Sequence, residues 1–507
     1  MDRSLSIEGG GVTAQESRPG KSRLGVLNYF IACFFFALVL MIGAVVNESN
    51  NACHIPFQIM LFLICSSPFF LGGNKPRHRL LVIFMACYYL IFGMSNFFGI
   101  ILGANDQFIM GTNRFLKAPD AGMPKSDWVV IIGAVSFLCG YYLLSKLYGN
   151  RQSRIFGKDW NYGMLFGMGL VFWILGFMVS VAYDMVVTPM NIPSEILGMP
   201  LGIASNVKLL TQLGGMMIIY LAVRGYRPGA VWPLLVLMII AEFCVGFIAN
   251  SKETSYRLPA LLTLGIYYIR GSINKKIIVI ILLSFIPYLL FFNIWRGSIM
   301  TYQNQVQAFN AFDKNAASVL KEASKQKNIA ATSLEGLKQR IDGKVYIDII
   351  VNGTDSGRVS FQSGKTLMFL FYGLIPRMLW SGKPDLTTGQ MFSRAFQLSA
   401  SRFTYVPSTI LGEFYWNFGT TGVIAGMICF GMVFGLLAYM LASGEGMTIV
   451  RFMLLLLATY FLAVRFESSI GLQYTNFIRL AFVLAILDAL VGFLGLRRRV
   501  EQTIVAA

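Results

Sequence analysis

Repeated apolar runs of about 20 residues constrain this chain more than any other feature of its sequence. The composition of the 507 residues reflects them, since 56% are hydrophobic and only 13% are charged. A soluble fold has no use for so many runs of this length, whereas the hydrocarbon core of a bilayer requires about 20 apolar residues for each helical span. The sequence therefore predicts an all-α polytopic membrane protein.

The apolar runs and the charges between them predict about twelve transmembrane helices. We place the spans at 25–46, 55–73, 80–103, 128–147, 162–183, 205–223, 230–249, 258–270, 276–294, 420–442, 449–465 and 476–496. Lys and Arg gather in alternate loops, as the positive-inside rule requires of cytoplasmic loops. Twelve spans put both termini in the cytoplasm. Much of the net charge of +18 is then topogenic and does not indicate nucleic-acid binding.

A long polar stretch after the ninth span sets the domain organisation. We expect a disordered cytoplasmic tail over 1–24, about nine spans over 25–294, a long periplasmic loop over 295–418, three spans over 419–496 and a basic cytoplasmic tail over 497–507. The apolar run 367–380 inside the loop is too short to span and contains Pro376 and Arg377, so we predict an interfacial or re-entrant segment. Residues 345–365 combine β-favouring side chains with Asn-Gly and Ser-Gly turn signals, which indicate a small hairpin.

Basic residues near the outer ends of the spans form the first candidate binding site. Arg and Lys at helix ends can be snorkelling anchors or contacts to anionic lipid headgroups. Outer positions run against the topogenic bias, however, and guanidinium groups bind phosphate in a bidentate manner. A lipid-linked diphosphate is a ligand that would fit such a cluster. The residues are Lys252, Arg257, Arg296, Arg377, Arg402 and Arg465.

Glu413 is the candidate acid–base residue, in the sequence GEFYWNFG just before a helix that we expect to open at Phe418. Its carboxylate could accept a proton from a sugar hydroxyl, hold an arginine, or simply be favoured by the dipole at a helix N-terminus. Glu467 is the second outer carboxylate, and we expect it to be a salt-bridge partner because it lies two residues after Arg465.

The glycine spacing bears on helix packing, and the histidine and cysteine counts bear on metal binding. Gly422, Gly426, Gly431 and Gly435 follow the four-residue spacing that lets membrane helices approach closely. The chain has only two histidines and no paired cysteine motif, so we expect no metal site, and we expect no cofactor.

Two stretches of the sequence resemble a known family. The run from Ile375-Pro376-Arg377 to Lys383-Pro384 and the run PSTILGEFYWNFG at 407–419 are similar to the O-antigen and capsular oligosaccharide repeat-unit polymerases (the Wzy family). The local similarity covers about 370–425, and the layout of spans and outer loop is similar over nearly the whole chain. The resemblance implies a metal-independent glycosyltransferase of the GT-C type in the bacterial inner membrane. Such an enzyme would polymerise undecaprenyl-diphosphate-linked repeat units at the periplasmic face.

The resemblance also implies roles for the candidate residues. The catalytic residues would be Glu413, Arg377 and Arg402, with the two arginines stabilising the diphosphate as leaving group. The substrate diphosphate would be bound by Arg296, Lys252, Arg257 and Arg465. The glycan platform would be Trp380, Tyr415 and Trp416. The implied partners are the lipid-linked oligosaccharide, membrane lipids and a chain-length regulator protein, with no nucleic acid.

Two alternatives remain open. An O-antigen ligase or another lipid-linked-sugar glycosyltransferase would share this layout, but the related ligases tend to carry a histidine in the long outer loop, where this chain has none. A flippase for lipid-linked oligosaccharide would need charges lining a cavity in the membrane. Glu242 and Asp488 are the acidic residues well inside predicted spans, and the sequence places few interior cations beside them.

Overall fold

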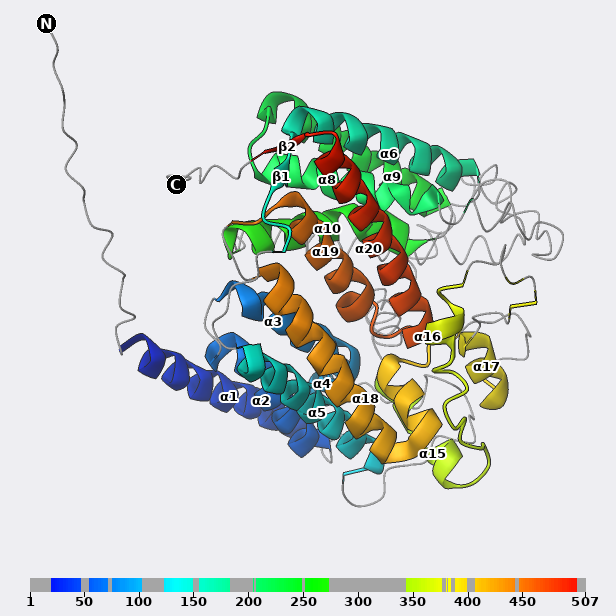
Figure 1. The fold of residues 1–507 in the computed structure, drawn as a ribbon. Helices are drawn as coiled ribbons and strands as arrows, with labels where there is room; N and C mark the ends of the chain where they lie inside the picture. Colours follow the sequence, from blue (N-terminus) through cyan, green and yellow to red (C-terminus); the bar gives the residue numbers. More distant parts are fainter. Residues whose placement is uncertain are drawn as a thin grey trace, which may run out of the picture.

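The computed structural model of this protein is a bundle of helices with one two-stranded sheet (Figure 1). Its described residues are 20–46, 54–71, 75–102, 123–148, 155–182, 204, 207–248, 251–272, 343–375, 380, 382–383, 388–398, 406–442 and 446–498. A helix occupies each predicted apolar run that falls in these ranges, while the run 276–294 lies outside them. Helices form here because a chain in lipid must bond its own N–H and C=O groups.

The elements follow one another along the chain with short connections in the described part. The helices are α1 (Gly20–Val46), α2 (Ile55–Leu71), α3 (Arg79–Phe92), α4 (Met94–Leu102), α5 (Lys125–Tyr148), α6 (Tyr162–Ala182), α8 (Leu210–Val223), α9 (Pro228–Ile248), α10 (Lys252–Arg270), α15 (Gly343–Asp355), α16 (Phe369–Tyr372), α17 (Thr388–Ala395), α18 (Ile410–Ala442), α19 (Ile449–Ala458) and α20 (Ile470–Phe493). A 3-10 turn, η2 (Pro76–His78), precedes α3, and a π-helix, η5 (Thr459–Val464), continues α19. Strand β1 (Asp159–Trp160) pairs antiparallel with β2 (Arg497–Arg498).

Six helices of the described part are long and apolar enough to cross a membrane, namely α1, α5, α6, α9, α18 and α20. The unit of η2, α3 and α4 bends by 51° and would count as a seventh span. Shorter apolar helices are α2, α8 and the continuous unit of α19 and η5. The protein is therefore a polytopic membrane protein of the all-α class, and the total of twelve spans stays a prediction.

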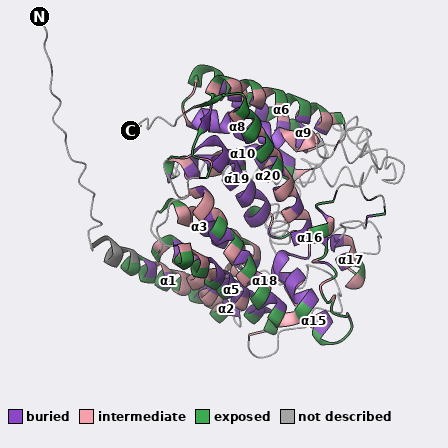
Figure 2. Cartoon of the chain, viewed as in Figure 1, coloured by how far each residue is buried: buried purple, intermediate pink, exposed green. Residues whose placement is uncertain are grey.

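Burial follows the pattern expected of a bundle in lipid. Phe30 and Phe34 of α1, Met178 of α6 and Leu237 of α9 are more than half exposed on the outside of the bundle. The central helices α8 and α19 are instead buried almost all round, as Figure 2 shows. Lipid tails are as apolar as these outer side chains, so the exposed faces are at no disadvantage in a membrane.

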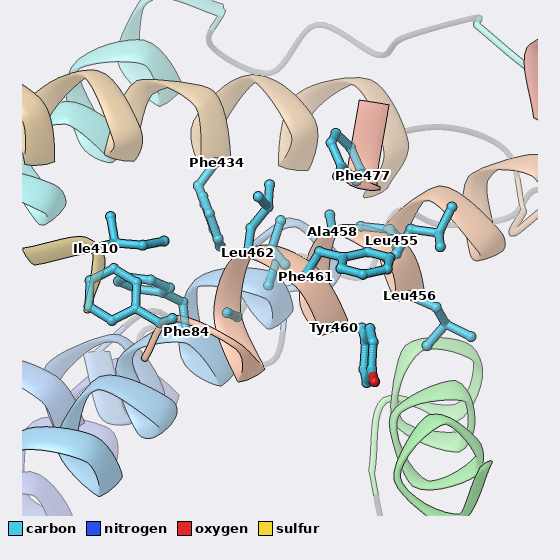
Figure 3. Packing of buried hydrophobic residues seen from close by; sticks show 14 of the residues in the cluster. Phe84, Ile410, Phe434, Leu455, Leu456, Ala458, Tyr460, Phe461, Leu462 and Phe477 are labelled. Carbon is cyan, nitrogen blue, oxygen red and sulfur yellow. The ribbon is translucent and has the colours of Figure 1, made fainter. Parts of the chain in front are cut away.

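Aromatic side chains fill the centre between α3, α18 and the α19–η5 unit. The Phe84 ring lies 4.9 Å from the Phe434 ring and 5.3 Å from the Phe466 ring, measured between centroids. Figure 3 shows Phe84 and Phe434 with Phe461 and Phe477, and Phe466 belongs to the same buried core. Aromatic pairs at such separations contribute about 0.5–1.5 kcal/mol each beyond the area that they bury.

Glycines bring α5 and α18 into backbone contact. A Cβ added at Gly140 would lie 2.0 Å from the Ile428 carbonyl oxygen, and one at Gly431 would lie 2.1 Å from the Phe137 carbonyl oxygen. Neither position leaves room for a side chain. The prediction that the glycine spacing of this helix serves close packing is confirmed.

Helix α18 is folded back on itself near its start. Phe418 and Gly419 have non-helical backbone angles, and Gly419 takes φ +63°. Gly422 and Gly426 both pack against Phe414, since a Cβ on either would lie 2.5–2.6 Å from Phe414 atoms. A straight helix would hold residues 414 and 426 about 18 Å apart, so the chain must reverse between them.

The first part of α18, residues 410–417, is called the α18 arm below. Because the arm is helical, α18 begins at Ile410, and the expectation that this helix opens at Phe418 was wrong. The physical reason is Gly419, whose positive φ permits a sharp reversal that few other residues tolerate. Glu413 consequently lies within a helix rather than in the loop before one.

Residues 343–355 form the helix α15 and not part of a β-hairpin, so that prediction was wrong. Ile347, Ile350 and Val351 are buried and share one face at helical spacing. The Cβ of residue 412, if present, would touch Ile350 and Ile347, so this face packs on the α18 arm. Packing of an amphipathic face has overridden the β preference of the residues. Within the predicted interfacial run 367–380, residues 369–372 form the short helix α16 and 376–379 lie outside the described part.

The two ends of the bundle differ in structure. At one end β1 and β2 pair, and Tyr220 Oη of α8 donates to the Met447 carbonyl just before α19 (2.9 Å). At the opposite end α15, α16 and α17 lie together (Figure 1). We call the described residues within 343–398 the cap and this end of the bundle the cap end.

Candidate functional site

The end opposite the cap is rich in cations. Its described basic residues are Lys75, Arg77, Arg79, Lys146, Lys158, Arg224, Arg227, Arg270, Arg451, Arg497 and Arg498. Several of them bond to backbone carbonyls of neighbouring segments, as when Arg79 Nη1 donates to the Tyr268 carbonyl at the end of α10 (2.6 Å) and Arg451 Nη2 donates to the Ile155 carbonyl in the turn before β1 (2.7 Å). Charges of this kind suit a topogenic role, which leaves the cap end as the candidate functional site.

Glu413 lies at the cap end, fully buried, on the α18 arm. Its Oε2 accepts the backbone N–H of Ile470 (3.0 Å), the first residue of α20. The preceding residue, Ser469, provides no side-chain cap, so the carboxyl group of another helix satisfies this free N–H. Glu413 therefore ties the α18 arm to the start of α20.

The other oxygen of Glu413, Oε1, is less well satisfied by hydrogen bonds. Oε1 has no hydrogen bond of good geometry within the described part, although Thr366 is a neighbour of this carboxyl group. The Thr366 hydroxyl accepts from Asn417 Nδ2 (2.6 Å), which leaves its own proton available to Glu413. Asn417 also accepts from the Gly364 N–H (2.8 Å), so the arm is joined to residues 364–366 of the cap.

Tyr415 belongs to a charged contact between the cap and α5. Its hydroxyl donates to Asp355 Oδ1 (2.8 Å), and Lys125 Nζ pairs with Asp355 Oδ2 (2.6 Å). The ammonium group of Lys125 also lies over the Tyr415 ring, 5.7 Å from its centroid. These residues fix the end of α15 to the first turn of α5 and to the α18 arm.

A second, buried group of charges holds the other end of α15. Asp127 of α5 pairs through Oδ2 with His54 Nδ1 (2.9 Å) and through Oδ1 with Lys344 Nζ (3.1 Å). Lys344 also pairs with Asp348 Oδ2 (3.1 Å). This group could not be predicted from the sequence because its members come from segments far apart in the chain. Asp127, an acid directly before the predicted span 128–147, was a local signal.

Two of the predicted diphosphate ligands are engaged in ion pairs. Arg257 is 6% exposed and donates from Nη2 to Glu242 Oε2 (2.8 Å), while Trp173 Nε1 donates to Glu242 Oε1 (3.1 Å). Arg465 pairs through Nη2 with Glu253 Oε2 (2.8 Å), and the Tyr460 hydroxyl donates to the same carboxylate. Arg465 therefore has Glu253 as its carboxylate partner, where the sequence had suggested Glu467.

The interior acids also have cationic partners. Glu242 pairs with Arg257, and Asp488 Oδ2 pairs with Arg497 Nη2 (2.6 Å) at the opposite end. The expectation that few cations accompany these acids was wrong, because Arg257 and Arg497 lie just outside the predicted spans and the fold brings their side chains back to the acids. Each of these acids is therefore neutralised by a cation of the protein itself.

The predicted aromatic platform is divided between surface and core. Trp380 is partly exposed and meets the Tyr372 ring edge-on, with centroids 5.3 Å apart. Trp416 is 1% exposed and packs against Phe392 and Phe396 of the cap. Of the predicted aromatic residues, Trp380 is the one placed to meet a ligand at the surface.

Several predicted site residues fall outside the described part. They are Arg296, Arg377 and Arg402, together with the side chain of Lys252, whose backbone begins α10. Within the described residues, no three His, Cys, Asp or Glu side chains are grouped so as to hold a metal ion.

Comparison with known proteins gives no relative from which to read a function. No family model, no curated protein and no solved structure matches the chain. The function must therefore be inferred from the cap end and from the sequence.

Proposed function

We propose that this protein is a metal-independent membrane glycosyltransferase that polymerises undecaprenyl-diphosphate-linked oligosaccharide repeat units into O-antigen or capsular polysaccharide. The observation that carries the proposal is the cap, a charged and aromatic structure bonded to one end of an otherwise apolar bundle. A substrate with a polyprenyl tail, a diphosphate and a sugar chain needs lipid, cations and aromatic surfaces in that order. The cap end offers these three environments side by side.

The distribution of charge supports an orientation for the reaction. By the positive-inside rule, the cation-rich end with β1 and β2 would face the cytoplasm of a bacterial inner membrane. The cap would then face the periplasm, where flipped lipid-linked repeat units are found. Both termini would be cytoplasmic with twelve spans of GT-C-like arrangement.

The proposed roles of the residues follow from their surroundings. Arg377 and Arg402 would stabilise the leaving diphosphate, with Arg296, Lys252 and Arg465 binding near them. We assign Arg257 a structural role, because Glu242 neutralises it in the interior. The pair of Arg465 with Glu253 is instead partly exposed, which leaves Arg465 open to a ligand. Trp380 would stack on sugar rings, Tyr415 would position the cap beside it, and Trp416 would support both from the core.

Glu413 has a buried position and a bond to α20, which favour positioning of the α18 arm over proton transfer. Its carboxyl group would hold the arm, and with it Tyr415, in place beneath the cap. A chain-length regulator and membrane lipids are further expected partners of such an enzyme.

The test is elongation by purified protein in lipid, with undecaprenyl-diphosphate repeat units as substrate and a chelator present. We expect long glycans on undecaprenyl diphosphate, and a loss of at least about 100-fold for Arg377→Ala and Arg402→Ala. Arg358→Ala is the matched control, since it removes an exposed cap arginine that the proposal does not use.

The products separate this function from its alternatives. Glycan transferred to a lipid A core acceptor would indicate a ligase, and translocation of unlengthened lipid-linked glycan in liposomes would indicate a flippase. Full elongation by both arginine variants would refute the assigned site while leaving the polymerase in place.

A further inference from the structure

Two cations converge on one backbone carbonyl where α20 meets the cap. Arg479 Nη2 of α20 donates to the Gly373 carbonyl oxygen (2.8 Å), and Lys383 Nζ donates to the same oxygen (3.3 Å). Lys383 Nζ also donates to the Ile375 carbonyl oxygen (2.8 Å). Two nitrogens bonded to one acceptor lie within about 6 Å of each other. The residues come from opposite sides of the joint, one from the bundle and one from the cap.

No acid among the described residues balances the charge of Arg479. Arg257, Arg465, Lys125 and Lys344 each have a carboxylate within ion-pairing distance. Arg479 has none among the described residues, and the carbonyl that it meets carries no net charge. An unneutralised cation in a membrane helix is expensive and marks a functional site by default.

Arg479 lies in the cap-side half of α20, where this helix meets the cap. It lies nine residues after Ile470, which is about 13 Å along α20 from its start at the cap end. The side chain is half-buried and reaches the Gly373 carbonyl, so its guanidinium group lies at the joint between α20 and the cap. Its bond to Gly373 uses one of five N–H donors.

Thr475 and Gly373 pack closely together beside the Arg479 side chain. Thr475, one turn earlier on α20, is 1% exposed, and its hydroxyl has no hydrogen-bond partner in the described part. A Cβ on Gly373 would lie 1.9 Å from that hydroxyl oxygen, so only glycine lets the carbonyl come this close to α20. Trp380 and Tyr372, the aromatic pair, flank the same two stretches of chain.

We propose that Arg479 and Lys383 form a binding site for a phosphate group, and that its ligand is the diphosphate of a polyprenyl-linked substrate. The free donors of the guanidinium group would bind phosphate oxygens in a bidentate manner, with the ammonium group as a second charge. The Thr475 hydroxyl offers a further donor beneath them. Only the identity of the lipid-linked ligand rests on the proposed function; the phosphate chemistry rests on the residues themselves.

The experiment measures binding and needs no turnover. Purified full-length protein is titrated with inorganic pyrophosphate in detergent. It is also placed in nanodiscs that contain either a polyprenyl diphosphate or phosphatidylglycerol at equal charge. We expect Arg479→Gln and Lys383→Gln to weaken pyrophosphate and polyprenyl diphosphate binding by at least about tenfold each. Arg479→Lys should lose less, and Arg358→Gln, the exposed control, should stay within about twofold of wild type.

Each outcome decides the proposal. Unchanged binding in folded Arg479→Gln and Lys383→Gln protein would overturn it, as would a preference for phosphatidylglycerol over the diphosphate. If Arg479→Gln does not fold, Lys383→Gln and Arg479→Lys still report on the site. Diphosphate binding without elongation would sustain this site and remove the polymerase, so the two ideas fail separately.

Discussion

Replacement of Glu413 separates a structural carboxylate from a catalytic one. In Glu413→Gln, the amide oxygen can still accept the Ile470 N–H, while the negative charge at the start of α20 is lost. The favourable interaction of that charge with the helix dipole contributes about 0.3–2 kcal/mol, and removal of a buried charge offsets part of it. We expect the free energy of unfolding of this variant to stay within about 1 kcal/mol of wild type.

The alanine variant should behave differently. Glu413→Ala leaves the Ile470 N–H buried without an acceptor, which costs about 1–3 kcal/mol. It also leaves a cavity in a position that is 0% exposed, and unfilled core volume adds a further cost. We expect a total loss of about 2–5 kcal/mol. Thermal unfolding in detergent, followed by tryptophan fluorescence, compares the three proteins.

Elongation by the same proteins tests the role of the residue. A positioning carboxyl group predicts that Glu413→Gln keeps elongation within a fewfold of wild type, because the α18 arm stays attached to α20. A general base predicts a loss of about 100- to 10,000-fold in a protein that is still folded. That second result would refute the positioning role.

Two further predictions concern packing and buried charge. Gly140→Ala should lower the free energy of unfolding by about 1–3 kcal/mol, because its Cβ would press on the Ile428 carbonyl oxygen. Gly167→Ala is the control: a Cβ there would have no atom within 4 Å, so this variant should be neutral or stabilising by up to about 1 kcal/mol. Equal melting temperatures for these two variants would contradict the α5–α18 contact. Glu242→Leu should cost about 3–5 kcal/mol by leaving Arg257 unpaired, and the double variant with Arg257→Met should recover most of that loss and retain elongation. A stable but inactive double variant would show that Arg257 does more than balance Glu242.

The electrostatics of the joint between α20 and the cap bear on how it works. Two unit positive charges within about 6 Å of each other repel by about 3 kcal/mol or more at an effective dielectric constant of 20, and by less where water reaches them. A bound anion would remove that repulsion.

The helical part of the fold could be predicted well from the sequence. The apolar runs determine where helices form, because lipid requires a segment to bond its own backbone, and that requirement is local. The α18 helix shows the limit of this reasoning. Its reversal depends on Phe414 fitting against Gly422 and Gly426, a contact that composition does not reveal.

The pairing of charges could not be predicted in the same way. Arg257 looked like a free outer cation, and only the approach of α9 to α10 shows that Glu242 neutralises it. Arg479 was not singled out from the sequence, although a charge within the predicted span 476–496 is itself a signal. Its partners on the cap lie about a hundred residues earlier in the chain.

The sequence by itself determined that this is a helical membrane protein with a polar, arginine-bearing segment at one end, since hydrophobic length and charge are properties of consecutive residues. Only the tertiary structure decided which arginines are already neutralised, which carboxyl group is a helix cap and which cations meet at Gly373. Coulomb interactions and hydrogen bonds depend on distance in space, and the fold alone sets those distances.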